Sequence, residues 1–256
     1  MSEKQPTVSI IIPCYNCEQF VGETMDAVLA QTYSDWECIL IDDASTDGSA
    51  DVIREYAARD ERFRPVLLER NVGAAGARNA GLDTVRGRYI AFLDSDDFWV
   101  PEKLEKQISF IEETGAPIVH SSYRFVDEDG EFLPGGVKAT DRVDLRLYMR
   151  NTEIGMSTSL VDGQQTGEFR LRDIRLCQDT NLWLELLSRG FVSRGIEEVL
   201  VHYRVREGQI SGSKFGMAKQ VFLLWMGIKQ VSLPMRLFSF ASYAVNGFRK
   251  RMQTPD

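Results

Sequence analysis

The chain has 256 residues, 43% of them hydrophobic and 27% charged, and its formal net charge is −8. This length allows one well-buried α/β domain with a smaller appendage, and the composition is ordinary for a globular protein. Proteins that bind nucleic acid normally carry a basic surface, so the acidic balance argues against a nucleic-acid partner.

The charge is unevenly distributed along the chain. Residues 1–201 contain 21 Lys and Arg against 36 Asp and Glu, whereas residues 202–256 contain nine against two. An acidic body therefore precedes a basic C-terminal segment. This asymmetry predicts that the C-terminus meets an anionic partner.

Apolar strand-like runs alternate with helical patterns four times in the first half of the chain. The predicted strands cover residues 7–12, 36–41, 63–69 and 88–93, and the predicted helices cover 22–31, 51–59, 71–85 and 100–113. This alternation predicts an α/β fold with a Rossmann-like, mostly parallel central sheet flanked by helices. Ligands bind beyond the carboxyl ends of such strands, so the polar clusters after the first, second and fourth strands should meet at one site.

The pattern loosens after residue 115. We expect strands at 117–127 and 199–205, a hairpin turn within 126–136, and helices at 144–150 and 179–190. A C-terminal helix over 235–249 is apolar except for a narrow polar stripe, formed by Arg236, Ser239, Ser242, Asn246 and Arg249, and Lys250 and Arg251 follow it. Such an amphipathic helix either packs on the core or lies in a membrane interface, and its basic charge favours the membrane.

The chain begins without an apolar run long enough for a signal peptide, and no stretch of 18 uncharged apolar residues occurs. Cys14 and Cys17 form a C-x-x-C pair, which is compatible with redox or zinc chemistry. A second such pair is absent and the chain has only two His, so free thiols in a reducing cytosol are the favoured interpretation.

The segment LDSDD (93–97) follows a buried strand and is the strongest chemical signal. Asp94 and Asp96 point to the same face of an extended chain, where two carboxylates repel each other unless a cation lies nearby. Such oxygen ligands suit Mg²⁺ or Mn²⁺, which commonly hold diphosphates. A helix N-cap is the alternative, but the segment has more acidic groups than a cap needs.

Two further segments support a phosphate-bearing ligand. IDDAST (41–46) places Asp43 at a strand end, where its carboxylate can accept hydrogen bonds from a base or a ribose. NVGAAGARNAG (71–81) has glycines that allow close approach of the backbone and Arg78, which offers positive charge. Its spacing differs from G-x-G-x-x-G, so it does not predict a nicotinamide dinucleotide, and a closely packed helix is the alternative.

Four segments together resemble glycosyltransferase family 2, the inverting family with the GT-A fold: VSIIIPCYN, QTYSDWECILIDDASTDGS, ERNVGAAGARNAG and GRYIAFLDSDDFWVPEKL, in order over residues 7–110. More loosely, the whole chain resembles bacterial enzymes that build exopolysaccharide, O-antigen or teichuronic acid. The resemblance implies metal-dependent transfer from a nucleotide-sugar, with a UDP-sugar favoured, to a hydroxyl of a saccharide or undecaprenyl-linked acceptor. It implies a nucleotide-sugar-binding half (1–115), an acceptor-binding half (116–216) and a helical tail (217–256). The expected location is cytoplasmic, peripheral on the inner face of the membrane.

The same resemblance assigns roles to single positions. Asp96 is expected to ligate Mn²⁺ or Mg²⁺, and seven residues are expected to bind the donor: Pro13, Tyr15, Asp43, Arg78, Asp94, Ser95 and Arg204. Of these, Pro13 and Tyr15 would line the uridine pocket and Asp43 would bind uracil. For the donor phosphate, Arg206 is an alternative to Arg204.

The family usually has a Glu-Asp pair at the start of a later helix, and CQDTNLWLELL (177–187) occupies that place. Gln178 replaces the usual Glu, which leaves the role of that position open, and Asp179 is expected to be the catalytic base. A simple helix cap is the alternative role for Asp179, with Asp173 and Glu185 as substitute bases.

Two other functions compete with the transferase. A nucleotidyltransferase usually has a Gly-rich, Lys- or Arg-bearing loop directly after its first strand, and IIPCYNCEQF (11–20) lacks one. An inactive glycosyltransferase-like scaffold would have no need to keep all four aspartates at 43, 94, 96 and 179.

Overall fold

The computed structural model describes residues 5–174, 176–206 and 214–249. Strands β1–β10 span Val8–Cys14, Trp36–Asp42, Phe63–Leu67, Tyr89–Phe92, Phe98–Trp99, Ile118–Val126, Phe132–Val137, Arg142–Val143, Leu160–Asp162 and Ser193–Arg204. Within the described part of the chain they form a ten-stranded sheet in the order β3-β2-β1-β4-β9-β6-β10-β5, with β7 paired to β6 and β8 paired to β10.

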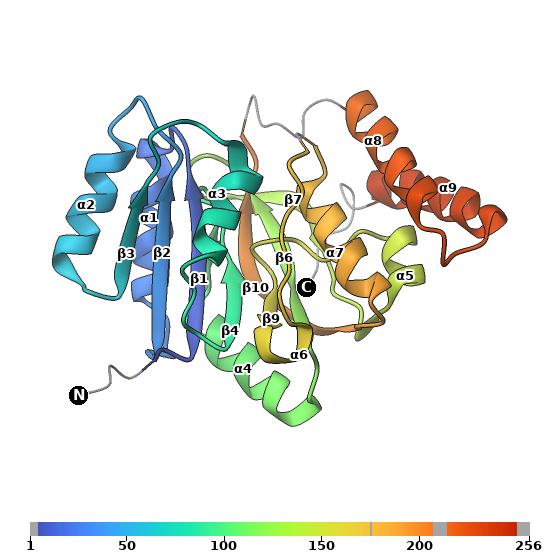
Figure 1. Cartoon of the computed structure of the whole chain (residues 1–256), viewed down its shortest axis with the longest axis horizontal. Coiled ribbons are helices and arrows are strands. Elements are labelled where there is room, and N and C mark those ends of the chain that lie inside the picture. Colours follow the sequence, from blue (N-terminus) through green and yellow to red (C-terminus); the bar gives the residue numbers. More distant parts are fainter. Residues whose placement is uncertain (1–4, 175, 207–213, 250–256) are drawn as a thin grey trace.

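Helices cover both faces of this sheet (Figure 1). Helices α1–α9 span Glu18–Leu29, Ser49–Arg59, Gly73–Leu82, Lys103–Thr114, Leu145–Arg150, Gly163–Thr166, Gln178–Ser188, Lys214–Gly227 and Leu233–Arg249. Side chains of α1, α2 and α4 share one core cluster, and side chains of α3, α5, α7 and α8 share the other. The predicted α/β fold, with a mostly parallel sheet between helices, is confirmed.

The first four parallel strands set the position of the site. Strand β1 pairs in parallel with β2 on one side and with β4 on the other, and β2 pairs in parallel with β3. The chain therefore reverses its direction of winding at β1, which makes the β1/β4 junction the switch point where α/β sheets bind ligands. All of β2 and nearly all of β1 are buried because helices cover both faces.

The second half of the sheet departs from the expected pattern. The antiparallel strand β9 lies between β4 and β6, and β10 begins at Ser193, six residues before the predicted strand. The Asp-Gly turn is present, since Gly130 N–H donates to Asp127 O and Gly130 has φ 84°. Pro134 and the two glycines after it lie within β7 instead of a turn, and an outer strand of this kind tolerates proline.

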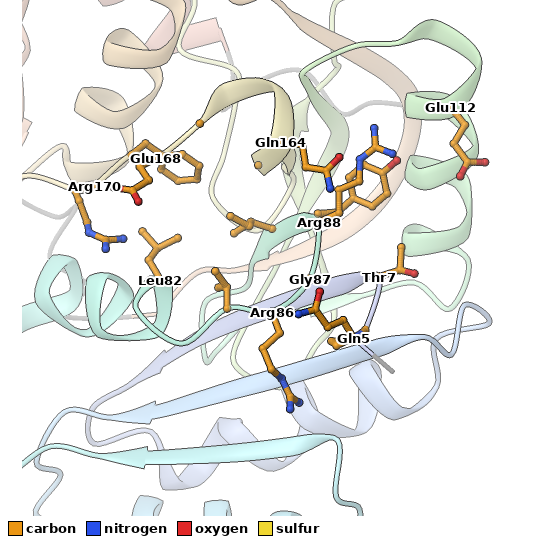
Figure 2. A pocket seen from close by; sticks show the side chains of 17 residues that line it. Gln5, Thr7, Leu82, Arg86, Gly87, Arg88, Glu112, Gln164, Glu168 and Arg170 are labelled. Carbon is orange, nitrogen blue, oxygen red and sulfur yellow. The ribbon is translucent and has the colours of Figure 1, made fainter. Parts of the chain in front are cut away.

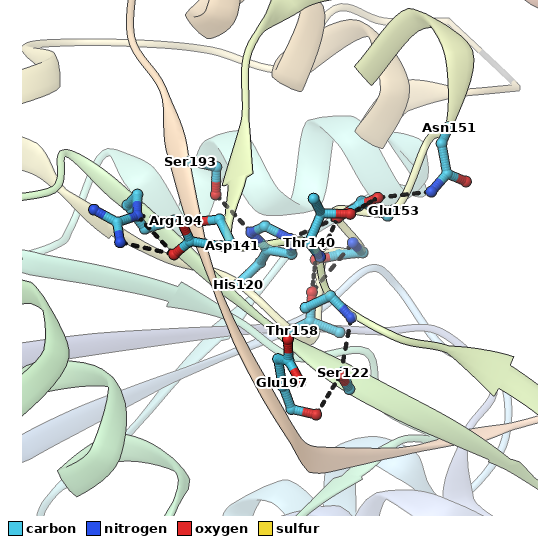
Figure 3. Close-up of polar contacts among 12 residues, drawn as sticks. His120, Ser122, Thr140, Asp141, Asn151, Glu153, Thr158, Ser193, Arg194 and Glu197 are labelled. Carbon is cyan, nitrogen blue, oxygen red and sulfur yellow. Dashed lines mark hydrogen bonds and ion pairs between the residues drawn. The ribbon is translucent and has the colours of Figure 1, made fainter. Parts of the chain in front are cut away.

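A buried polar network ties this half together (Figure 3). His120 Nδ1 lies 2.8 Å from Ser193 Oγ, and His120 Nε2 lies 3.3 Å from Glu153 Oε1. Glu153 also accepts hydrogen bonds from Thr140 N–H and Asn151 Nδ2. His120, Glu153 and Ser193 are fully buried. This Ser-His-Glu arrangement therefore joins β6, β10 and the 139–153 segment and does not face a substrate.

The C-terminal helices pack on the core through α8. Trp225 is fully buried and its Nε1 donates to Met149 O at 2.8 Å. Helix α9 packs against α5, and both α8 and α9 lie on the far side of the molecule from α2 and β3 (Figure 1). Of the helices that the structure describes, none has the length and apolar character to cross a membrane. Lys250 and Arg251 lie outside the described residues.

Candidate active site

The loops after β1 and β2 hold each other in place. Asn16 N–H donates to Ser45 Oγ at 3.0 Å, and Asn16 Oδ1 accepts from Thr46 N–H at 2.8 Å. Asn16 and Ala44 both have left-handed backbone, with φ of 47° and 57°. Non-glycine residues rarely adopt this conformation, and it concentrates at functional sites.

Two predicted pocket residues belong to the first of these loops and its strand. Pro13 is half-buried within β1, where it pairs with Ile41 of β2. Tyr15 follows the strand and is 50% exposed, so its ring is accessible to a ligand at the strand ends. Both residues lie at the edge that the sequence predicts for a uridine pocket, and their contact with uridine stays a prediction.

Asp43 anchors the start of α3. Its Oδ1 and Oδ2 accept the backbone N–H groups of Val72 and Gly73 at 2.7 and 2.8 Å. Burial raises the pKa of Asp43, and these two hydrogen bonds oppose the rise. Gly73 has φ 77°, a conformation that favours glycine. Asp43 therefore fixes the backbone at the start of the Gly-rich helix, and it also occupies the position predicted to bind the base.

Arg78 links three segments that are distant in sequence. Its Nη2 donates to Asp94 Oδ1 at 2.5 Å, and its Nη1 donates to Gln178 Oε1 at 3.3 Å. Arg78 is 7% exposed, so this pairing is largely shielded from water. The structure thus brings together the Gly-rich helix, the first carboxylate of LDSDD and the residue before the expected base.

Asp96 faces an arginine from the end of β10. Arg206 Nε lies 2.8 Å from Asp96 Oδ2. Arg204 is 2% exposed, its Nε donates to Asp96 O at 2.9 Å, and its other donors contact Glu23 and the carbonyl of Glu128. Arg204 therefore braces the loop through buried contacts. Its predicted role toward donor phosphate stays a prediction, and Arg206 is the arginine that pairs with the Asp96 carboxylate.

The remaining residues of LDSDD are held by groups that the sequence did not indicate. Buried Asp97 accepts from Ser157 Oγ at 2.6 Å and from Arg204 N–H at 3.0 Å. Burial, followed by the charges of Asp96 and Asp94, raises the pKa of Asp97 well above its ordinary value. Ser157 Oγ also accepts from Asp94 N–H, at 3.1 Å.

Thr24 braces the same loop from α1. Its Oγ1 lies 3.0 Å from Ser95 O and 2.9 Å from Asp97 O. Ser95 itself is half-buried. Neither Thr24 nor Ser157 belongs to a recognisable motif, so only the coordinates reveal that they fix the geometry of this loop.

Asp179 is the second residue of α7. Cys177 directly precedes the helix, and its left-handed backbone, with φ of 59°, turns the chain into it. Burial raises the pKa of Asp179, while the positive charge of Arg78 lowers it and the charge of Asp94 raises it. These influences place Asp179 in the same electrostatic environment as the Arg78–Asp94 pair. A carboxyl with a raised pKa suits a general base.

The two substitute bases lie in different surroundings. Asp173 is exposed, and Glu185 pairs with Arg189 at 2.5 Å further along α7. Burial, then the charges of Cys177 and Asp179, raises the pKa of Tyr243 on α9 to about 12.

The carboxylates of LDSDD offer the hard oxygen atoms that Mg²⁺ and Mn²⁺ prefer. Within residues 5–174, 176–206 and 214–249, no group of three or more His, Cys, Asp or Glu side chains could hold a metal by itself. Magnesium sites in phosphate-binding enzymes often use only one or two carboxylates and complete their coordination with substrate phosphates and water. The residues present fit that type, and Asp96 stays the predicted ligand, with its carboxylate paired with Arg206 in this structure.

A hollow of about 710 Å³ lies at the opposite ends of β1 and β4 (Figure 2). Three arginines line it, and each pairs with an acid: Arg86 with Glu37, Arg88 with Asp162 and Arg170 with Asp83. The hollow faces the amino ends of the strands, away from the aspartates described above. The four cysteines are free thiols, of which Cys14, Cys17 and Cys38 are buried.

The fold and the acidic strand ends define a GT-A glycosyltransferase type of protein. Among solved structures, Staphylococcus aureus TarS 1–349 in complex with UDP-GlcNAc superposes with a TM-score of 0.74 at 18% identity, over 95% of this chain and 73% of that one. The mannosyltransferase PcManGT from Pyrobaculum calidifontis, in complex with GDP-Man and Mn²⁺, superposes with a TM-score of 0.67 at 16% identity. The match covers 95% of this chain and 74% of that one. At this identity the likeness concerns the fold alone.

The sequence comparisons identify the family. The model of Glycosyl transferase family 2 matches residues 9–171. The putative teichuronic acid biosynthesis glycosyltransferase TuaG of Bacillus subtilis is 38% identical over 98% of this chain and all of its own length. The Escherichia coli UDP-Glc:alpha-D-GlcNAc-diphosphoundecaprenol beta-1,3-glucosyltransferase WfaP is 36% identical, over 95% of this chain and 94% of its own length. This chain belongs to glycosyltransferase family 2.

Proposed function

We propose that this protein is an inverting glycosyltransferase that moves a sugar from a UDP-sugar to a hydroxyl of a lipid-linked saccharide in bacterial surface polysaccharide synthesis. The observation that carries the proposal is that Arg78 contacts both Asp94, at the carboxyl end of β4, and Gln178, the residue before Asp179. A base, a cation and an acidic ligand set at one edge are the parts that one displacement at a sugar diphosphate requires.

The donor is expected to lie across the three strand ends. Its base and ribose would lie near Asp43 and Tyr15, at the ends of β2 and β1, and its diphosphate near LDSDD and the start of α3. Helix N-termini favour phosphate, and α3 begins with a glycine there. Arg78 pairs with the carboxylate of Asp94, and Arg206 pairs with that of Asp96. They would turn toward the diphosphate as it arrives and offset its charge.

Asp179 accepts the proton of the acceptor hydroxyl as that oxygen attacks the anomeric carbon. The C1–O bond to the diphosphate breaks as the new bond forms, so one carboxylate is sufficient and the anomeric configuration inverts. Gln178 holds Arg78 by a neutral hydrogen bond, which leaves the arginine's charge for Asp94 and the donor. A Mn²⁺ or Mg²⁺ ion on Asp96, when bound, would add positive charge at the leaving diphosphate.

The acceptor class rests on the relatives. WfaP is named for a diphosphoundecaprenol-linked acceptor and UDP-glucose, and TuaG for teichuronic acid synthesis. Both are covered by this chain over nearly their whole length, which supports a lipid-linked saccharide here. Residues 116–216 would then hold the acceptor and residues 1–115 the donor, with 217–256 as a helical tail. The same acceptor favours a location at the inner face of the cell membrane.

Calorimetry with UDP-, GDP- and dTDP-sugars, with and without Mn²⁺, tests the proposal. We expect one nucleotide class, UDP, to bind in a Mn²⁺-dependent way and Asp96→Ala to lose that dependence. Asp51→Ala, which removes an exposed carboxylate on α2, is the control and should bind like the wild type. If no nucleotide-sugar binds under either condition, the donor site is refuted and an inactive scaffold becomes the better description.

A further inference from the structure

Helix α9 presents its polar stripe to the protein. Ser239 is fully buried, Asn246 Nδ2 donates to Arg150 O at 3.0 Å, and Arg236 donates to Val231 O and Met226 O at 2.6 and 2.8 Å. Met235, Phe240 and Tyr243 of the same helix also pack against the core, so α9 turns polar and apolar side chains inward together.

The outward face of α9 carries exposed apolar side chains. Leu233, Leu237 and Val245 are 56%, 49% and 55% exposed, and exposed Ala241 completes a row at every fourth position. Residues four apart lie on one helix face, so the row is continuous. Phe238 beside it is 56% exposed. On the neighbouring helix α8, Phe222 and Leu223 are 37% and 54% exposed, and the ring of Phe222 lies 5.2 Å from that of Phe240 on α9. Contiguous exposed apolar surface of this kind marks a contact site.

The charge around this face identifies its partner. Residues 214–256 carry seven basic side chains and one acidic side chain, whereas residues 1–201 carry 36 acidic and 21 basic side chains. Lys219 and Lys229, on α8 and just after it, are exposed. An anionic bilayer attracts this segment and repels the body. A second copy fits less well, because apolar contact between two α9 helices would bring two basic tails together.

We propose that the outward apolar face of α8 and α9 lies in the interface plane of an anionic membrane. The apolar row enters the headgroup boundary, and Lys219 and Lys229 contact lipid phosphates. The lipid contact stands independently of the proposed reaction, because it depends only on the tail.

Flotation with vesicles containing equal parts of phosphatidylglycerol and phosphatidylcholine tests the contact. We expect the full chain to float with these vesicles and to bind pure phosphatidylcholine much more weakly. Leu237→Gln with Val245→Gln should weaken binding at least about tenfold. Each substitution replaces an apolar side chain that would enter the membrane by a polar one, and each CH₂ no longer buried costs about 0.8 kcal/mol of binding free energy. Leu29→Gln with Leu67→Gln, the same kind of change at exposed positions on α1 and β3, should have no effect.

A charge reversal provides the second arm. Lys219→Glu with Lys229→Glu should weaken binding about thirtyfold or more, at roughly 1 kcal/mol for each basic residue near the surface. Lys106→Glu with Lys138→Glu changes the net charge equally but on the body, and should leave most of the binding. Each variant should bind UDP like the wild type, so loss of flotation is separate from failure of the donor site.

Three results would overturn the inference. The full chain could stay at the bottom of the gradient with anionic vesicles. The control variant Lys106→Glu with Lys138→Glu could lose as much vesicle binding as Lys219→Glu with Lys229→Glu. Light scattering could show a stable dimer that Leu237→Gln with Val245→Gln converts to a monomer, which would assign the face to a second copy.

Discussion

Replacing the Asp179 carboxylate by an amide removes the proposed proton acceptor with little change in shape. Burial raises the pKa of Asp179, so the folded protein pays for the charge of this side chain, and a neutral Asn avoids that cost. The lost attraction of a first-turn carboxylate to the helix dipole is about 0.3–1 kcal/mol. Because the two effects oppose each other, the free energy of unfolding of Asp179→Asn should change by less than about 1 kcal/mol.

Turnover should fall far more than stability. A positioned general base contributes about 10²–10⁴-fold to rate, equivalent to about 2.7–5.4 kcal/mol of activation free energy. The neighbouring carboxylate of Asp94 is not expected to take over, because Asp94 is assigned to the donor side of the site beside Arg78. Donor affinity should stay within about twofold of the wild type, since the diphosphate meets Arg78 and the LDSDD loop, which the substitution leaves in place.

The assay compares initial rates of UDP release at saturating donor and acceptor with calorimetric binding of UDP. Glu185→Gln is the matched control, because it makes the same chemical change in the same helix at a residue paired with Arg189. It should retain full kcat. A kcat for Asp179→Asn within tenfold of the wild type would refute the base assignment. Equal losses of turnover and UDP binding would instead make Asp179 a structural residue of the donor site.

Two further predictions concern the donor site and its pH dependence. Asp43→Ala leaves the N–H groups of Val72 and Gly73 without their acceptors, so urea unfolding should report a loss of about 1–3 kcal/mol and calorimetry at least tenfold weaker UDP binding; unchanged values for both would contradict the role given to Asp43. On the acidic side, kcat should rise with pH as Asp179 ionises, and Arg78→Gln should move that rise to higher pH because the Arg78 charge lowers the pKa of Asp179; a shift to lower pH would contradict this electrostatic picture.

The sequence predicted the parallel half of the sheet well because β1, β2 and β4 are largely apolar and are bounded by polar residues. The other half is less regular. Strand β9 has only three residues, too few to show a pattern, and β10 passes through exposed Glu197 and Glu198, where its pairing with β6 shifts register. An irregular strand of this kind loses the alternation from which its start would be predicted.

Periodicity predicted α9 as an amphipathic helix but could not say which face turns inward. The structure shows α8 packed on the core through Trp225, whereas membrane contact by the exposed apolar row of α9 stays a prediction. The polar stripe faces inward because the carbonyls of Arg150, Met226 and Val231 offer hydrogen-bond acceptors there. Those acceptors come from other elements, so the stripe alone does not reveal its orientation.

At the site, topology brought together what spacing had indicated. Asp43 follows β2 and Asp94 follows β4, and these two strands flank β1, so the sheet order puts both residues at the same edge of the sheet. Thr24 and Ser157 have no such signal, since one lies inside α1 and the other in a turn before β9. Their hydrogen bonds decide where the LDSDD carboxylates stand, and this part of the site depends on tertiary packing alone.

The charges of the folded site also account for Gln178. Arg78 and Arg206 each neutralise one LDSDD carboxylate, while Asp179 lies beside them with a raised pKa. A Glu at 178 would add another negative charge next to Asp179 and compete with Asp94 for Arg78. Gln accepts the same hydrogen bond without that charge. The departure from the usual Glu-Asp pair therefore preserves the link to Arg78, and it leaves the arginine bound to one carboxylate that an arriving diphosphate can displace.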